Sequence, residues 1–149
     1  DFQPTLWLPR EEADVQQVWF AGCHGDVGGG HPPCPDSGSL LAANSLQWMT
    51  KQAAQFGLGL QRHTAIGGKA DALAPMHESR RTFYRFRERY ARPIEPLISY
   101  KTSQVSVPTR IHHSVQARWH ADGSYRPRAL VEHLKSHQDA PDGGWNLVS

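Results

Sequence analysis

The residues best suited to chemistry lie in one short stretch, His24-Gly25-Asp26, followed closely by Gly28-Gly29-Gly30. Histidine takes up and releases a proton near neutral pH, so it is a frequent general acid or base in enzymes. The apolar run Val18-Trp19-Phe20 precedes it and breaks at Gly22, as a buried strand does before a loop. The stretch therefore predicts a general base at the mouth of a strand, with a loop histidine beside a glycine-rich turn as the alternative.

The neighbours of His24 have supporting functions in this interpretation. Asp26 could assist the histidine directly, but an aspartate near glycines commonly accepts backbone N–H groups and closes a turn, so we favour a structural role for it. Gly28, Gly29 and Gly30 would allow a substrate to approach the backbone closely. Their N–H groups could also form a small anion-binding nest, for which a glycine run alone is weak support.

A metal site is the main chemical alternative for this region. Cys23, His24, His31 and Cys34 all carry side chains that bind zinc. Their spacing is unlike paired CxxC motifs, and adjacent residues of a strand point to opposite faces. We therefore predict neither a metal nor a cofactor here. The two cysteines could pair, but nothing in the sequence requires a disulfide. His113 is expected to hydrogen-bond locally at the start of a helix.

The elements that must position His24 follow from hydrophobic patterning. Residues 15–21 predict a strand covered on both faces, as in a parallel sheet. After a proline-rich loop, Ser37 or Ser39 is expected to cap a helix that reaches about Phe56 and stops at Gly57. Its predicted buried face contains Ala42, Leu46, Met49, Ala53 and Phe56, with Trp48 and Met49 expected in the core. Strand, loop and helix in succession favour an α/β fold.

The second half of the chain is less regular. We expect a helix over 78–91, extended segments or an edge strand over 93–110, a short helix from His112 toward Trp119, and a helical turn over 129–134. Residues 135–149 are expected to form a disordered tail. With 149 residues, 38% of them hydrophobic, the chain is long enough for one domain with a modest core, which we place at residues 1–134.

Several short motifs occur in an order that resembles a known family. The residues that carry the resemblance are Phe2-Gln3-Pro4-Thr5-Leu6-Trp7, the stretch 18–30, Ser45-Leu46-Gln47-Trp48-Met49, Met76-His77-Glu78-Ser79, Ile111-His112-His113-Ser114-Val115 and Tyr125-Arg126-Pro127. In this order they resemble an α/β-hydrolase-like family of bacteria and fungi that includes the type VI secretion phospholipase effectors.

The resemblance implies a fold and a reaction. The chain would be the C-terminal portion of an α/β-hydrolase-like domain, a parallel sheet flanked by helices that is incomplete as given. His24 would be the triad base that activates a serine against a carboxylic ester, with a phospholipid acyl ester as one candidate substrate. No Gly-x-Ser-x-Gly elbow occurs in the sequence, so the serine and the triad acid are expected upstream of Asp1. The fragment alone is then expected to be inactive.

The sequence also departs from the family pattern. His31-Pro32-Pro33-Cys34 stands where the resemblance leads one to expect a tyrosine after the glycines, and Ala42-Ala43-Asn44 stands where it expects Ser-Asp-Ile. Without the aspartate of the expected Ser-Asp-Ile, the glycine loop would be anchored less tightly. An inactive copy of the enzyme is therefore an alternative to an active one.

A non-catalytic function is the second hypothesis. Arginines recur from Arg80 to Arg92 on the predicted helix, and this basic surface could bind an anionic membrane or an acidic partner. The formal net charge of +2 favours no nucleic-acid partner. No stretch approaches the ~18 apolar residues of a membrane helix, and no signal-peptide pattern is visible. Location therefore stays open between the cytoplasm and export as an effector.

Overall fold

The computed structural model describes residues 6–8, 10, 12–59, 68–78 and 91–149. These residues fall into two compact units. Unit 1 contains the described residues of 1–19, 89–112 and 126–148, and unit 2 contains those of 20–88, 113–125 and 149.

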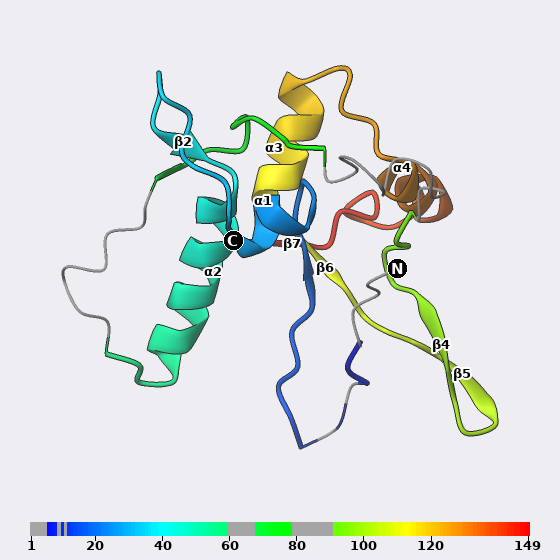
Figure 1. The fold of residues 1–149 in the computed structure, drawn as a ribbon. Coiled ribbons are helices and arrows are strands. Elements are labelled where there is room, and N and C mark those ends of the chain that lie inside the picture. The colour runs from blue at the N-terminus through cyan, green and yellow to red at the C-terminus, as the bar shows by residue number, and fades with distance from the viewer. Residues whose placement is uncertain (1–5, 9, 11, 60–67, 79–90) are drawn as a thin grey trace, which may run out of the picture. The chain divides into compact units, whose positions relative to one another are not determined.

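A small parallel sheet forms the centre of unit 1 (Figure 1). Strand β6 (Arg110–His112) lies between β1 (Val18–Trp19) and β7 (Leu147–Val148), and both pairings are parallel. Ile111 of β6 is fully buried, as Val107 and Leu130 are. The predicted parallel strand is confirmed, although β1 is shorter than the predicted 15–21 and is only half-buried because it lies at the sheet edge.

An antiparallel hairpin and a helix complete unit 1. Strands β4 (Leu97–Tyr100) and β5 (Ser103–Ser106) pair across a tight turn in which Lys101 has a φ of 54°. Prolines on both sides of the hairpin limit further pairing. Helix α4 (Arg128–Ser136) follows Pro127, whose restricted φ suits the start of a helix. The extended segments predicted for 93–110 and the helical turn predicted for 129–134 are confirmed.

The segment after α4 differs from the expected disordered tail. The carboxylate of Asp142 accepts the backbone N–H of Gly144 at 3.0 Å and that of Asn146 at 2.6 Å, which closes a turn. The chain then enters β7, where it pairs with β6. Local turn chemistry and a partner strand from residues 110–112 therefore order a segment whose composition alone suggested fraying.

The described residues of unit 2 form three helices and one short parallel strand pair (Figure 1). The helices are α1 (His24–Gly28), α2 (Ala42–Gln55) and α3 (His113–Ala121), and the strands are β2 (Ser39–Leu40) and β3 (Lys69–Ala70). Helix α2 ends as predicted at Gly57, whose φ is 84°. The N–H groups of Gly57 and Leu58 bond the carbonyls of Ala54 and Ala53, a Schellman motif. Because Ser39 pairs in β2, α2 begins later than predicted.

The predicted buried face of α2 is largely wrong. Leu46, Met49 and Phe56 are 43%, 56% and 78% exposed, whereas Ser45 and Trp48 are buried. The Trp48 ring packs edge-on against Phe20 with 6.1 Å between centroids. The helix is therefore rotated relative to its apolar stripe, because its neighbours in unit 2 accept Trp48 and a small serine. Trp48 belongs to the core as expected, and Met49 does not.

The basic helix predicted over 78–91 lies almost entirely outside the described residues, so the interaction hypothesis built on Arg80 to Arg92 stays a prediction. In the part of the chain that the structure describes, no helix combines the length and the apolar character needed to cross a bilayer.

Candidate functional site

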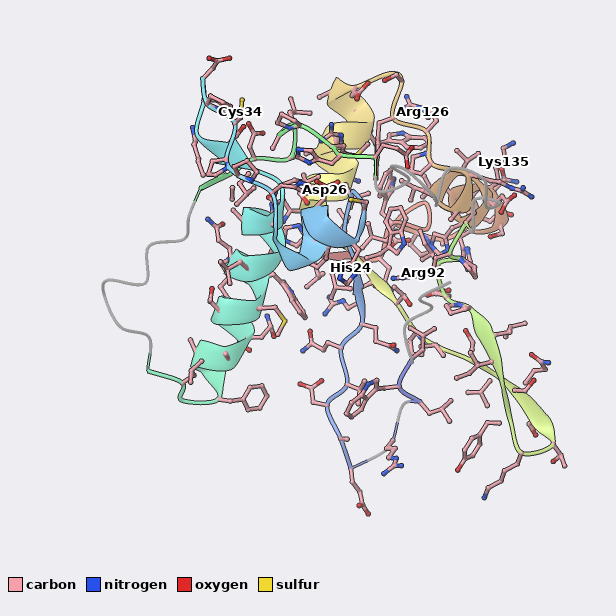
Figure 2. All side chains as sticks on the ribbon, in the orientation of Figure 1. His24, Asp26, Cys34, Arg92, Arg126 and Lys135 are labelled. Carbon is pink, nitrogen blue, oxygen red and sulfur yellow. The ribbon has the colours of Figure 1, made fainter. Side chains whose placement is uncertain are left out.

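His24 is the first residue of α1 and its side chain is exposed. Figure 2 shows His24 and Asp26 on this short helix. Among the described residues, the His24 ring has no hydrogen-bond or ion-pair partner. Its ring is therefore exposed and, within the described part of the chain, is oriented by no carboxylate.

Asp26 is buried, in contrast to His24, and is 2% exposed. Its Oδ2 accepts the backbone N–H of Cys23 and that of His77, each at 3.0 Å. Its Oδ1 lies 2.6 Å from Nδ1 of His77. Burial by itself raises the pKa of the Asp26 carboxyl, but the hydrogen bonds from Cys23 and His77 outweigh it and lower the pKa. Asp26 thus anchors the loop as a carboxylate, in line with the structural role favoured for it.

The His77 ring is held on a second side by His31. The two rings stack with 3.7 Å between centroids and 9° between planes. The His31 ring also lies against Gly25, where a Cβ would come within 2.7 Å of its Nε2. A side chain at position 25 would therefore displace His31. The packing of the His31 ring thus explains why a glycine stands between His24 and Asp26.

Glycine is required most clearly at position 22. Gly22 has a φ of 105°, and a Cβ there would lie 2.4 Å from Cβ of Asp26. Gly29 and Gly30 also have positive φ values, 90° and 117°, but open space surrounds the place of a Cβ at each. Gly28 has no positive φ, and the place of a Cβ there is likewise open. The run 28–30 thus leaves an open backbone surface beside α1, as close approach of a substrate would need.

Helices α2 and α3 hold the segments that carry this cluster. The Ser45 hydroxyl of α2 bonds the carbonyl of Val27 in α1. From α3, Nη1 of the buried Arg118 donates to the carbonyls of Ala72 and Ala74 at 2.8 and 2.9 Å. Arg118 therefore positions the segment that leads to His77.

The zinc set considered from the sequence is not assembled. Candidate ligand atoms of Cys23, Asp26 and His31 lie within 4.8 Å of one another, and neither His24 nor Cys34 belongs to this group. Asp26 already accepts bonds from His77 on both oxygens, and His31 stacks on His77. A hydrogen-bonded cluster accounts for this arrangement. Cys23 and Cys34 are both free thiols.

His77 belongs to the motif Met76-His77-Glu78-Ser79, for which the sequence predicted no function. Its contact with Asp26 spans 51 positions, so no local spacing could reveal it. The motif itself was the only signal. Of the other histidines considered, His112 is buried in β6 and His113 begins α3.

Comparison with known families finds a similarity in the N-terminal part of the chain. Residues 1–52 match the family model for the type VI secretion system phospholipase effector Tle1-like catalytic domain. The Tle1-like match confirms the predicted resemblance over about a third of the chain, and it includes His24, Asp26 and the glycines. The motifs at 76–79, 111–115 and 125–127 lie outside it. No curated protein and no solved structure shows significant similarity to this chain.

Proposed function

We propose that this chain supplies the histidine-bearing part of a serine-dependent carboxylic ester hydrolase of the phospholipase type. The observation that carries the proposal is the Tle1-like catalytic-domain match, which contains the complete stretch from Val18 to Gly30. The proposed substrate class is a carboxylic ester, with the acyl ester of a phospholipid as the leading candidate. The proposed fold is the C-terminal portion of an α/β-hydrolase domain, and the parallel pairing of β6 with β1 and with β7 supports it.

His24 is the general base in this proposal. Its ring takes the proton of a serine hydroxyl as that oxygen attacks the ester carbonyl carbon. The tetrahedral intermediate then expels the alcohol, which leaves with the proton from His24. Water attacks the acyl-enzyme in the same way, with His24 again as base, and releases the fatty acid. The exposure of His24 and the anchoring of its helix by Asp26 suit a group that must meet a substrate in a defined position.

The serine and the acid of the triad are proposed to come from polypeptide outside these residues. The sequence contains no Gly-x-Ser-x-Gly elbow, and among the described residues His24 has no carboxylate partner. A triad enzyme without its nucleophile retains only a small residual rate. Residues 1–149 alone should therefore show no ester turnover.

The His77–Asp26 pair is the competing candidate for the base, because an aspartate bonded to Nδ1 is the arrangement that orients a catalytic imidazole. We favour His24 because the His31 ring stacks on one face of His77 and the Tle1-like match ends before it. The two histidines make distinct predictions, so one experiment separates them.

The test uses the natural full-length protein that carries an elbow serine, with a soluble p-nitrophenyl ester and phospholipid vesicles as substrates. His24→Gln should lower kcat/KM by about 10³-fold or more while circular dichroism stays unchanged. His77→Gln serves as the matched variant and should reduce turnover only as far as it reduces folding. Loss of turnover in His77→Gln with full activity in His24→Gln would transfer the base function to His77 and refute the proposal.

A further inference from the structure

A second group of candidate ligands lies in unit 1, apart from the proposed hydrolase loop. One ligand atom from each of Glu95, His133 and His137 lies within 4.8 Å of the other two. His133 and His137 are one helical turn apart at the end of α4, and Glu95 precedes β4. Two imidazoles and one carboxylate form a donor set that binds zinc and related transition metals.

The hydrogen bonds of the two rings determine which nitrogens are free. Nε2 of His133 lies 2.8 Å from the carbonyl oxygen of Gly144. Nδ1 of His137 lies 3.0 Å from the carbonyl oxygen of His133. A carbonyl oxygen only accepts, so we assign the protons to these two nitrogens. The Ser136 hydroxyl also lies 3.0 Å from Nδ1 of His137, and it fits this assignment as an acceptor because it donates its own proton to the carbonyl of His133. The neutral rings therefore have lone pairs at Nδ1 of His133 and Nε2 of His137. A backbone carbonyl that holds one ring nitrogen is the usual support of a metal-binding histidine.

The distance between His137 and Glu95 fits two ligands of one ion. Nε2 of His137 and Oε2 of Glu95 are 3.6 Å apart. A direct charge-assisted hydrogen bond would be about 2.7–2.9 Å long. Two atoms that each bind Zn²⁺ at about 2.0–2.2 Å in tetrahedral geometry lie roughly 3.3–3.6 Å from each other. The separation is thus too long for a direct hydrogen bond, lies within the range of an ion pair, and is close to that of two metal ligands.

The surroundings of Glu95 support a site with room for an ion. Glu95 has a φ of 56°, a backbone conformation that non-glycine residues rarely adopt and that occurs often at functional sites. Its side chain is about a quarter exposed. Together with His133, His137, Ser106 and Ser136, it lines an open cavity of about 480 Å³. Water from this cavity could complete the coordination.

We propose that Glu95, His133 and His137 bind one divalent transition-metal ion, with Zn²⁺ as the best fit to the donor set. Two imidazole ligands argue against Ca²⁺ and Mg²⁺, which prefer oxygen donors. The ion would link the segment before the β4–β5 hairpin to the end of α4 and stabilise unit 1. From the sequence, a metal was considered only at Cys23, His24, His31 and Cys34, so this site is a separate proposal, and it does not depend on the proposed ester hydrolysis.

The experiment measures metal binding by the tag-free 149-residue chain after chelator treatment. Calorimetric titration with Zn²⁺ should show one ion per chain, and Co²⁺ should give visible absorption bands from nitrogen and oxygen ligation. Glu95→Gln and His137→Gln should each weaken Zn²⁺ binding at least about tenfold, the effect that loss of an outer-shell partner alone can have. Zn²⁺ should raise the unfolding temperature of the unmodified chain and not that of Glu95→Gln.

Two controls make the result decisive. Glu132→Gln changes another carboxylate of the same cavity, one that pairs with Arg128, and should leave Zn²⁺ affinity unchanged. Cys23→Ser removes a ligand from the Cys23–Asp26–His31 cluster and should also leave it unchanged. The proposal is overturned if Cys23→Ser rather than Glu95→Gln abolishes binding. It is equally overturned if the chain binds no Zn²⁺, in which case Glu95 and protonated His137 form an ion pair. His133 is buried, so its replacement would also disturb the packing of unit 1. The more exposed Glu95 is therefore the residue whose variant decides the test.

Discussion

Nδ1 of His77 lies 2.6 Å from Oδ1 of Asp26, although 51 positions separate the two residues. The same carboxylate accepts the N–H groups of Cys23 and His77 through Oδ2. One buried side chain therefore joins the start of α1 to the segment after β3. This connection helps to hold the loop of His24. Four predictions follow, in addition to the separate His24→Gln and His77→Gln replacements described above.

Replacement of Asp26 by Asn should destabilise unit 2. The amide keeps the shape of the carboxylate but points an NH₂ group toward N–H donors, so buried donors lose their acceptor. We expect a loss of roughly 1–3 kcal/mol in the free energy of unfolding, measured by urea denaturation. Asp139→Asn, at an exposed position, is the control and should change stability by less than about 0.5 kcal/mol. Equal stability of the two variants would contradict the anchoring role of Asp26.

The stability of the chain should fall as the pH drops below 3.8 because of the same carboxylate. The pKa of Asp26 is lowered in the folded state from its ordinary value of 3.8. A lowered folded pKa means that the contribution of Asp26 is fully present above 3.8 and is lost as the pH falls through the folded pKa. Unfolding free energies measured between about pH 5 and about pH 2 should therefore decline less steeply in Asp26→Asn than in the unmodified chain. Parallel curves would show that Asp26 titrates alike in both states.

Alanine should be poorly tolerated at position 22 and well tolerated at position 28. Gly22→Ala places a Cβ against Asp26 and forces a φ of 105° on a residue with a side chain, which we expect to cost about 1–3 kcal/mol. Gly28 lies inside α1 with open space around it and no positive φ, so Gly28→Ala should be neutral or stabilise by up to about 1 kcal/mol. Thermal unfolding of the two variants provides the measurement. The reverse order of stabilities would contradict the described path of the loop.

Arg118 should matter more for stability than an exposed arginine. Arg118→Met leaves the carbonyls of Ala72 and Ala74 without their donor and loosens the segment that carries His77. We expect a loss of roughly 1–3 kcal/mol, with faster amide hydrogen exchange around residues 72–77. Arg128→Met removes an exposed ion pair with Glu132 and should cost no more than about 1 kcal/mol. Unchanged exchange in Arg118→Met would show that the segment is held by other contacts.

Local patterns in the sequence were enough to predict several elements. Gly57 ends α2 in a left-handed conformation, as a glycine after an apolar periodic stretch suggests. The prolines around the β4–β5 hairpin and the apolar run before Gly22 likewise indicated extended segments. These predictions succeeded because each depends on the conformational limits of one or two residues, which act wherever the chain folds.

Properties that depend on partners far along the chain could not be predicted in this way. The apolar stripe of α2 suggested that Leu46 and Met49 face the core, but contacts of Trp48 with Phe20 and of Ser45 with Val27 select another face. The composition of the last residues suggested disorder, but β6 supplies a parallel neighbour to β7. The hydrophobicity of a side chain indicates whether it favours burial. Which side chains are buried is decided by the neighbours against which the helix packs.

The sequence by itself determined the chemical character of the loop, because the types and spacing of His24, Asp26 and the glycines can be read from it directly. The Tle1-like match of residues 1–52 includes that stretch. Only the tertiary structure decided that Asp26 is paired with His77 and that Glu95 lies beside His133 and His137. Both groupings join side chains that are distant along the chain. Their distances are set by the packing of whole elements, for which a linear sequence carries no direct signal.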